Sequence, residues 1–209
     1  LPGGEAAVRE PRRSALGLLV AAFGEQVLSW DDLLPIRAFD STERTVLAGA
    51  MARGTNSPWT TSAGRLFDGV AALVGLGERS AFEGQTAMAL EFAVDPAVRD
   101  AYPFGGSDWG PLLAAVVEDV RHGLPPGTIA ARFHNAFVAG IVGVAKEVGC
   151  ATVALSGGCF QNRVLTERAV AALTASRFTV LLHRQVPPND GGIALGQLAV
   201  AAARLGSGR

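Results

Sequence analysis

A short apolar run that ends in two adjacent glycines places the strongest constraint on the fold of this chain. The segment spans residues 151–162 and reads "ATVALSGGCFQN"; the segment directly after it, "RVLTERAVAALTAS", has the composition of a helix. Adjacent glycines at the end of a strand are costly unless the backbone bends sharply or approaches another group closely. The segment therefore predicts a buried strand, a tight turn and the N-terminus of a helix.

A second strand and a second helix follow at once. The strand is predicted in "FTVLLHRQV", and the helix in "DGGIALGQLAVAAARL". A strand–helix–strand connection of this length implies a right-handed crossover and a parallel pair of strands. We therefore predict an α/β fold with a small parallel sheet, and divide the chain into a mainly helical part, residues 1–149, and a strand-helix-strand-helix core, residues 150–209.

Capping residues and apolar spacing predict helices in the first part. One helix starts near Pro11, a residue favoured in the first turn, and stops at Gly24. Asp40 and Glu43 have the spacing of a capping box at the start of another helix. Further along, apolar residues recur at the i, i+3, i+4 spacing of a helix with one buried face: Leu66, Phe67, Val70, Leu73 and Val74.

The last helix of this part is predicted in "TIAARFHNAFVAGIVGVAKEVG", with Thr128 as its cap. His134 lies in this segment among alanine, phenylalanine and valine residues. We interpret His134 as a packing residue rather than a catalytic base.

Composition excludes several classes of protein. Of the 209 residues, 49% are hydrophobic and 18% are charged, with a formal net charge of -1. The basic field of a nucleic-acid binder is missing, and we expect neither a membrane span nor a secretory signal. Cys150 and Cys159 are the only cysteines and form neither a CxxC pair nor a disulfide framework. We therefore expect a cytoplasmic protein, and, because the chain begins at Leu1 without Met, a fragment of a longer one.

Both glycine turns are candidates for ligand binding. The amides of Gly157 and Gly158 and the hydroxyl of Ser156 precede a helix N-terminus, where phosphate oxygens commonly bind. The second turn repeats the arrangement with Asp190 at the predicted N-cap and two glycines behind it. Ligands of parallel sheets bind beyond the carboxyl ends of the strands, where both turns would lie. Two structural alternatives stay open: glycine suits any tight connection, and Asp190 can be only a cap.

Five segments in order resemble the C-terminal part of the hydrogenase-maturation carbamoyltransferase HypF family. They read "TNSPWTTSAGRLFDGVAALVGL", "AFEGQTAMALE", "ARFHNAF", "ALSGGCFQNRVL" and "PPNDGGIALGQ" and cover nearly the whole chain. That region of the family is similar to the tRNA threonylcarbamoyladenosine transferases and the antibiotic O-carbamoyltransferases. The resemblance implies a helix-rich α/β lobe of the actin/sugar-kinase/chaperone ATPase-like fold.

The resemblance also implies an activity, its cofactors and its partners. The family makes carbamoyl-adenylate from carbamoyl phosphate and ATP. It then transfers the carbamoyl group to the C-terminal cysteine of a partner maturation protein, on the way to nickel–iron hydrogenase. The implied cofactors are ATP or carbamoyl-adenylate and a divalent metal ion. The implied partners are that maturation protein and the remaining domains of the full-length carbamoyltransferase.

Individual site residues follow from the same resemblance. Asp68, Gly84 and Asn162 fall where relatives hold adenosine and its ribose. Gly157 and Gly158 match the phosphate-facing turn, to which Ser156 could add a hydroxyl, and Asp190 matches a metal-ligating aspartate. We expect the nucleotide-binding residues to converge in space.

One departure from the family concerns the metal. Relatives complete the metal site with two histidines four residues apart, whereas His122, His134 and His183 are dispersed here. We therefore expect half a site, and no catalysis by this chain alone.

Two other interpretations stay open. Cys159, His183 and Asp190 could form the Cys-His-Asp constellation of a hydrolase or acyltransferase, although Gln161 occupies a position where the sharp nucleophile turn requires glycine. Alternatively the chain is a non-catalytic docking or nucleotide-binding half-domain, with Trp109 as part of its surface.

Overall fold

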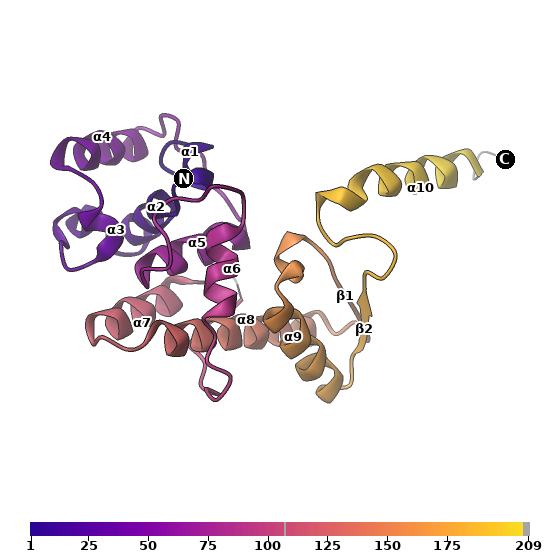
Figure 1. The fold of residues 1–209 in the computed structure, drawn as a ribbon. Helices are drawn as coiled ribbons and strands as arrows, with labels where there is room; N and C mark the ends of the chain where they lie inside the picture. The colour runs from indigo at the N-terminus through magenta and orange to yellow at the C-terminus, as the bar shows by residue number, and fades with distance from the viewer. Residues whose placement is uncertain (107, 207–209) are drawn as a thin grey trace. The chain divides into compact units, whose positions relative to one another are not determined.

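The computed structural model describes residues 1–106 and 108–206 (Figure 1). The chain forms two compact units, Leu1–Gly140 and Ile141–Arg209, and each unit is described by itself. The boundary between them falls inside the helix α8 (Pro126–Val148). We predicted a division at residue 149 from the change in secondary structure, whereas the contacts divide the chain slightly earlier.

Within its described residues, the regular secondary structure of unit 1 consists of helices joined by loops. Before α8, its elements are α1 (Ala6–Arg9), α2 (Pro11–Phe23), the 3-10 helix η1 (Glu25–Ser29), α3 (Leu34–Arg37), α4 (Ser41–Ala52), α5 (Ala63–Leu73), α6 (Gln85–Phe92) and α7 (Gly110–Arg121).

Local signals set the helix ends where the sequence predicted them, with one exception. Helix α2 begins at Pro11 and ends before Gly24. The predicted capping box of α4 is present: Glu43 N–H donates to Asp40 Oδ1 across 2.7 Å, and Asp40 N–H donates to the Glu43 carboxylate across 3.2 Å. The predicted cap Thr128 was wrong, because α8 starts at Pro126, whose fixed φ suits the first helical position.

The core of unit 1 forms where α5 packs against α2. Every residue of α5 from Arg65 to Leu73 is buried, including the predicted apolar face. The two helices approach closely at Gly69, where an added Cβ would lie 2.4 Å from Leu18 Cδ1 and 3.3 Å from the Ala15 backbone nitrogen. Glycine at this position therefore allows the helices to pack.

His134 belongs to an aromatic cluster of unit 1. It is fully buried, and its Nδ1 lies 2.7 Å from the carbonyl oxygen of Ala130. Its ring meets the ring of Phe67 edge-on at 5.3 Å, and Phe133 and Phe137 complete the cluster. This environment agrees with the predicted packing role.

Unit 2 contains the predicted strand-helix-strand-helix pattern. After α8 it consists of β1 (Thr152–Leu155), the 3-10 helix η2 (Gly158–Gln161), α9 (Arg163–Ala175), β2 (Thr179–Leu182), the 3-10 helix η3 (Asp190–Gly192) and α10 (Ile193–Gly206). The strands pair in parallel, with Thr152 opposite Thr179 and Leu155 opposite Leu182. The structure is an α/β lobe, as predicted.

Helices α8 and α10 differ in how their apolar side chains are covered. By length and composition alone, α8 could cross a membrane, yet 56% of its most apolar window is buried in the protein, as in the core helix of a globular domain. Every described residue of α10 is exposed, including Leu198 at 67% and Leu205 at 83%. Helix α10 therefore presents uncovered apolar surface.

Candidate functional site

The two glycine turns of unit 2 lie side by side at the carboxyl end of the sheet. Since Leu155 pairs with Leu182, Ser156 and His183 directly follow the paired strand ends. His183 Nε2 and Ser156 Oγ are 2.8 Å apart. Beyond them, Gly157 N–H donates to the carbonyl oxygen of Pro188 across 2.8 Å. The sequence placed both turns at this edge, and the structure confirms it.

Gly157 and Gly158 have different roles in the first turn. Gly157 has φ +102°, a conformation that residues with a Cβ rarely adopt, and its amide is already bound to Pro188. Gly158 begins η2, and a Cβ there would meet only Asn189 Cβ at 3.9 Å. The expected phosphate contact from the Gly157 amide therefore competes with a hydrogen bond inside the protein.

Asn162 caps the helix that follows this turn. Its Oδ1 accepts a hydrogen bond from Leu165 N–H across 2.8 Å at the start of α9. This is a structural role for the side chain that the resemblance assigns to adenosine or ribose.

The second turn is capped by Asn189, and the predicted Asp190 cap was wrong by one residue. Asn189 Oδ1 accepts a hydrogen bond from Gly191 N–H across 3.1 Å. Asp190 is the first residue of η3, and its side chain is exposed. The extended backbone of Asn189 lets its side chain turn back onto the first helical amides, as an N-cap requires.

The residues present do not make a metal site. Within 1–106 and 108–206, no group of three His, Cys, Asp or Glu side chains gathers closely enough to hold a metal ion. A divalent cation needs several oxygen or nitrogen ligands, so the Asp190 carboxylate alone does not provide a site. The role of Asp190 as one ligand of a larger site stays a prediction.

Asp68 and Gly84 belong to the corner of unit 1 where α5 packs against α6: Asp68 lies in α5, and Gly84 is the N-cap of α6. Asp68 is 2% exposed, and its Oδ2 lies 2.9 Å from Arg65 Nη1. The Ala87 backbone, in the first turn of α6, favours the charged form of this carboxylate. The N-cap of that helix is Gly84, which has no side chain to accept a hydrogen bond from the first helical amides.

The electrostatics of Asp68 are dominated by its burial. Removal from water raises the pKa of Asp68 to about 6, the Arg65 guanidinium opposes this rise, and the Glu83 carboxylate adds to it. Gly84 has φ +81°, and no atom lies within 4 Å of the position its Cβ would take. The backbone of Gly84 is therefore open to a ligand, whereas Asp68 is covered. Their convergence with the residues of unit 2 stays a prediction.

His183 does not support the Cys-His-Asp interpretation. Its Nε2, the atom that would serve as a base, is engaged by the hydroxyl of Ser156. Cys159 lies in η2 and is half-buried. The hydrolase alternative therefore gains nothing from this geometry.

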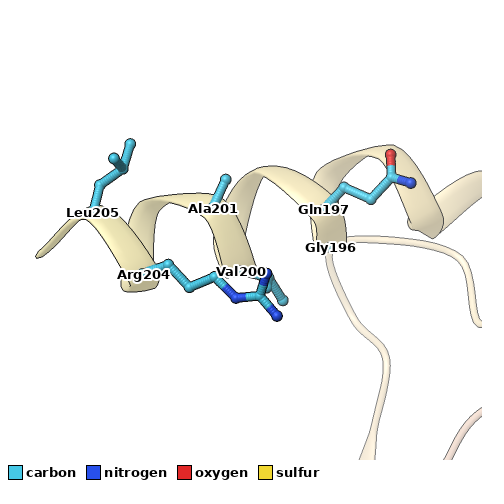
Figure 2. Close-up of a pocket in the computed structure, with 6 residues that line it drawn as sticks. All are labelled: Gly196, Gln197, Val200, Ala201, Arg204 and Leu205. Atoms are coloured by element: carbon cyan, nitrogen blue, oxygen red, sulfur yellow. The ribbon is translucent and has the colours of Figure 1, made fainter. Parts of the chain in front are cut away.

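A hollow along α10 is separate from the predicted residues. Figure 2 shows the side chains that line it, all from one helix: Gly196, Gln197, Val200, Ala201, Arg204 and Leu205. None of them belongs to the glycine turns or to the Asp68 corner. The hollow is a stretch of exposed helix surface.

Comparison with known proteins decides the family. A model of the family described as "Carbamoyltransferase, Kae1-like Domain, second subdomain" matches residues 1–197. This chain belongs to the HypF carbamoyltransferase family. It is 36% identical to carbamoyltransferase HypF of Synechocystis sp. over 95% of its length, and 39% identical to that of Rhodobacter capsulatus over 99%.

Solved HypF structures match the fold as well. The crystal structure of full-length HypF in the phosphate- and nucleotide-bound form covers 100% of this chain with a TM-score of 0.85 and 34% identity. The structure of HypF from T. kodakarensis covers 98% of this chain with a TM-score of 0.81 and 26% identity. The chain spans 28% of the length of Synechocystis HypF and 27% of that of Rhodobacter capsulatus HypF.

Sequence reasoning missed the side chains that contact the HypF-like site residues. Arg65, which pairs with Asp68, was not singled out, although a basic residue three positions before a carboxylate on a helix is a recognisable pair. His183 was placed in the hydrolase alternative. Its contact with Ser156 could have been anticipated, because residues directly after the ends of two paired parallel strands are neighbours.

Proposed function

We propose that this chain supplies a nucleotide-facing lobe of a carbamoyltransferase that acts in nickel–iron hydrogenase maturation. One observation carries the proposal: a HypF structure that holds phosphate and nucleotide matches the whole chain with a TM-score of 0.85. The pair of turns at the carboxyl end of β1 and β2 supports it, because ligands of parallel sheets bind at this edge.

The proposed reaction passes a carbamoyl group from carbamoyl-adenylate to the C-terminal cysteine of a partner maturation protein. The cysteine thiolate attacks the carbamoyl carbon, a carbon–sulfur bond forms, and the bond from that carbon to the adenylate oxygen breaks. AMP leaves with the electron pair, and the thiol proton passes to water. The developing negative charge on AMP requires hydrogen-bond donors at the phosphate.

The residues of unit 2 suit the phosphate end of such a substrate. The Ser156 hydroxyl is exposed, and Gly158 leaves the backbone of η2 open to close approach. Asn162, which the resemblance assigns to adenosine or its ribose, caps α9 directly after the same turn.

In unit 1, the open backbone of Gly84 suits adenosine or ribose. Because Asp68 is buried, its side chain would contact ribose only if the residues packed over it moved. Because the residues present do not fit a metal, we derive no step through one.

By itself the chain is proposed to bind rather than to catalyse. The Synechocystis and Rhodobacter capsulatus relatives are more than three times as long, so the remaining domains of the carbamoyltransferase would make carbamoyl-adenylate. The uncovered apolar surface of α10 favours a role that includes docking, either to those domains or to the partner protein. We place this reaction in the cytoplasm.

The test uses a hybrid in which this chain replaces the matching region of Synechocystis HypF. The hybrid is mixed with carbamoyl phosphate, ATP and a maturation protein that ends in cysteine. Mass spectrometry is expected to find one carbamoyl group on that cysteine, and none when the terminal cysteine is changed to serine. Synechocystis HypF itself is the positive control, and Synechocystis HypF without this region is the negative control.

The outcome against the proposal is specific. A folded hybrid that makes carbamoyl-adenylate and leaves the cysteine unmodified, while Synechocystis HypF modifies it, would show that this chain does not support transfer.

A further inference from the structure

The contact between His183 and Ser156 joins the two turns at the side-chain level. The Nε2 and Oγ atoms are 2.8 Å apart, and both side chains are exposed. Their backbone positions are set by the paired ends of β1 and β2, which they directly follow. The hydrogen bond from Gly157 N–H to the Pro188 carbonyl oxygen also holds the two turns together. The sheet and the adjoining turns therefore set the backbone positions from which the two side chains meet.

The chemistry of this contact depends on which atom donates. A serine hydroxyl has one donor and two acceptor lone pairs. If His183 carries its proton on Nε2, the ring donates to Ser156 Oγ, and the hydroxyl proton stays available for a third group. The hydrogen bonds then run in one direction, from ring to hydroxyl to acceptor, and each strengthens the next.

A phosphate oxygen is the acceptor that suits this arrangement. The amide of Gly157 is engaged by Pro188, which leaves the Ser156 hydroxyl as the first donor of the turn that can point outward. Ser156 directly follows the paired end of β1, at the edge of the parallel sheet where ligands of such sheets bind.

We propose that His183 is a positioning residue for the Ser156 hydroxyl. Its Nε2–H donates to Ser156 Oγ and turns the hydroxyl proton toward a phosphate oxygen of the bound adenylate. The inference rests on the proposed function, because it takes the adenylate as the ligand. It assigns His183 a role in phosphate recognition and none in proton transfer to the substrate.

The experiment compares two probes that differ only in the phosphate, AMP and adenosine. Binding of each to the 209-residue chain is measured by isothermal titration calorimetry. His183→Ala is expected to weaken AMP binding roughly tenfold, because the Ser156 hydroxyl loses its fixed orientation toward the phosphate, and to leave adenosine binding unchanged. His183→Gln restores most of the AMP affinity, because its amide places an N–H donor near the position of Nε2.

Two further variants separate positioning from general structure. In a Ser156→Ala background, His183→Ala is expected to cause no further loss, because the hydroxyl it orients is gone. His122→Ala is the matched control, since this exposed histidine ends α7 in unit 1. Circular dichroism checks that each variant is folded.

Each remaining outcome is decisive. If the unaltered chain binds adenosine and AMP equally or binds neither, the proposed phosphate contact fails and the inference fails with it. If the unaltered chain prefers AMP and His183→Ala keeps that preference, only the inference is overturned. An equal loss of AMP and adenosine in His183→Ala would assign His183 a structural role and also overturn it.

Discussion

The amide of Gly157 donates a hydrogen bond to the carbonyl oxygen of Pro188, 31 positions along the chain, across 2.8 Å. This bond ties the turn after β1 to the turn after β2, and with them the residues that the HypF resemblance assigns to phosphate. A bond of this kind uses a backbone donor that a ligand would otherwise bind. The turn is thus held in its shape without a ligand, and in the proposed function donors other than the Gly157 amide contact the phosphate.

Substitution of the two adjacent glycines is expected to separate stability from binding. Gly157→Ala forces a residue with a Cβ to φ +102° and is expected to destabilise unit 2 by about 1–3 kcal/mol. Gly158→Ala meets only ordinary contact with Asn189 and leaves stability within about 0.5 kcal/mol. It nevertheless weakens AMP binding, because a methyl group stands where the phosphate approaches. Urea denaturation followed by amide NMR signals of β1 and β2 measures the first effect, and calorimetry the second. Equal stability of the two variants would contradict the expectation.

Gly69 and Gly64 provide a matched pair on α5. Gly69→Ala places its Cβ 3.3 Å from the Ala15 backbone nitrogen, which cannot move aside as the Leu18 side chain can, and is expected to destabilise unit 1 by about 1–3 kcal/mol through overpacking. Gly64→Ala has its nearest neighbour, Ser62 Oγ, at 3.5 Å and is expected to be neutral or stabilising by up to about 1 kcal/mol. All three tryptophans lie in unit 1, so tryptophan fluorescence during denaturation reads its stability. A neutral Gly69→Ala would show that the two helices are not closely packed.

The buried carboxyl of Asp68 makes the stability of unit 1 depend on pH. Its pKa is raised from 3.8 to about 6, so between these values the folded state binds more protons than the unfolded state. The contribution of Asp68 therefore favours folding at low pH and is lost as the pH rises from about 4 to about 6, by about 3 kcal/mol at most. Asp68→Asn removes this slope, whereas the exposed control Asp190→Asn keeps it. Fluorescence-monitored urea denaturation at several pH values tests the pair, and a wild-type slope in Asp68→Asn would contradict the assignment.

The cap of the second turn is tested at Asn189 and its neighbour. Asn189→Ala removes the acceptor for Gly191 N–H and is expected to cost about 1 kcal/mol in unit 2. Asp190→Asn changes an exposed side chain that is not the N-cap and is expected to change stability by less than about 0.5 kcal/mol. The same NMR-monitored denaturation measures both. A larger loss in Asp190→Asn than in Asn189→Ala would restore Asp190 as the cap.

The sequence by itself determined the features that depend on neighbours within one turn or one strand. Pro11, Gly24 and the Asp40–Glu43 pair set helix ends, because capping involves residues at most a few positions apart. The apolar spacing around Phe67 identified the buried face of α5. The glycine turns and the two short strands predicted the parallel pair, and the ordered motifs identified the HypF family.

Only the tertiary structure decided which atoms meet across long separations in the chain. It placed Asp68 under α6 beside Arg65, bound Gly157 to Pro188, brought His183 to Ser156, and gave the cap of η3 to Asn189 instead of Asp190. The physical reason is that a polar group's partner depends on which donors and acceptors folding brings within about 3 Å. Residue type and spacing limit those candidates, and the packed chain selects among them.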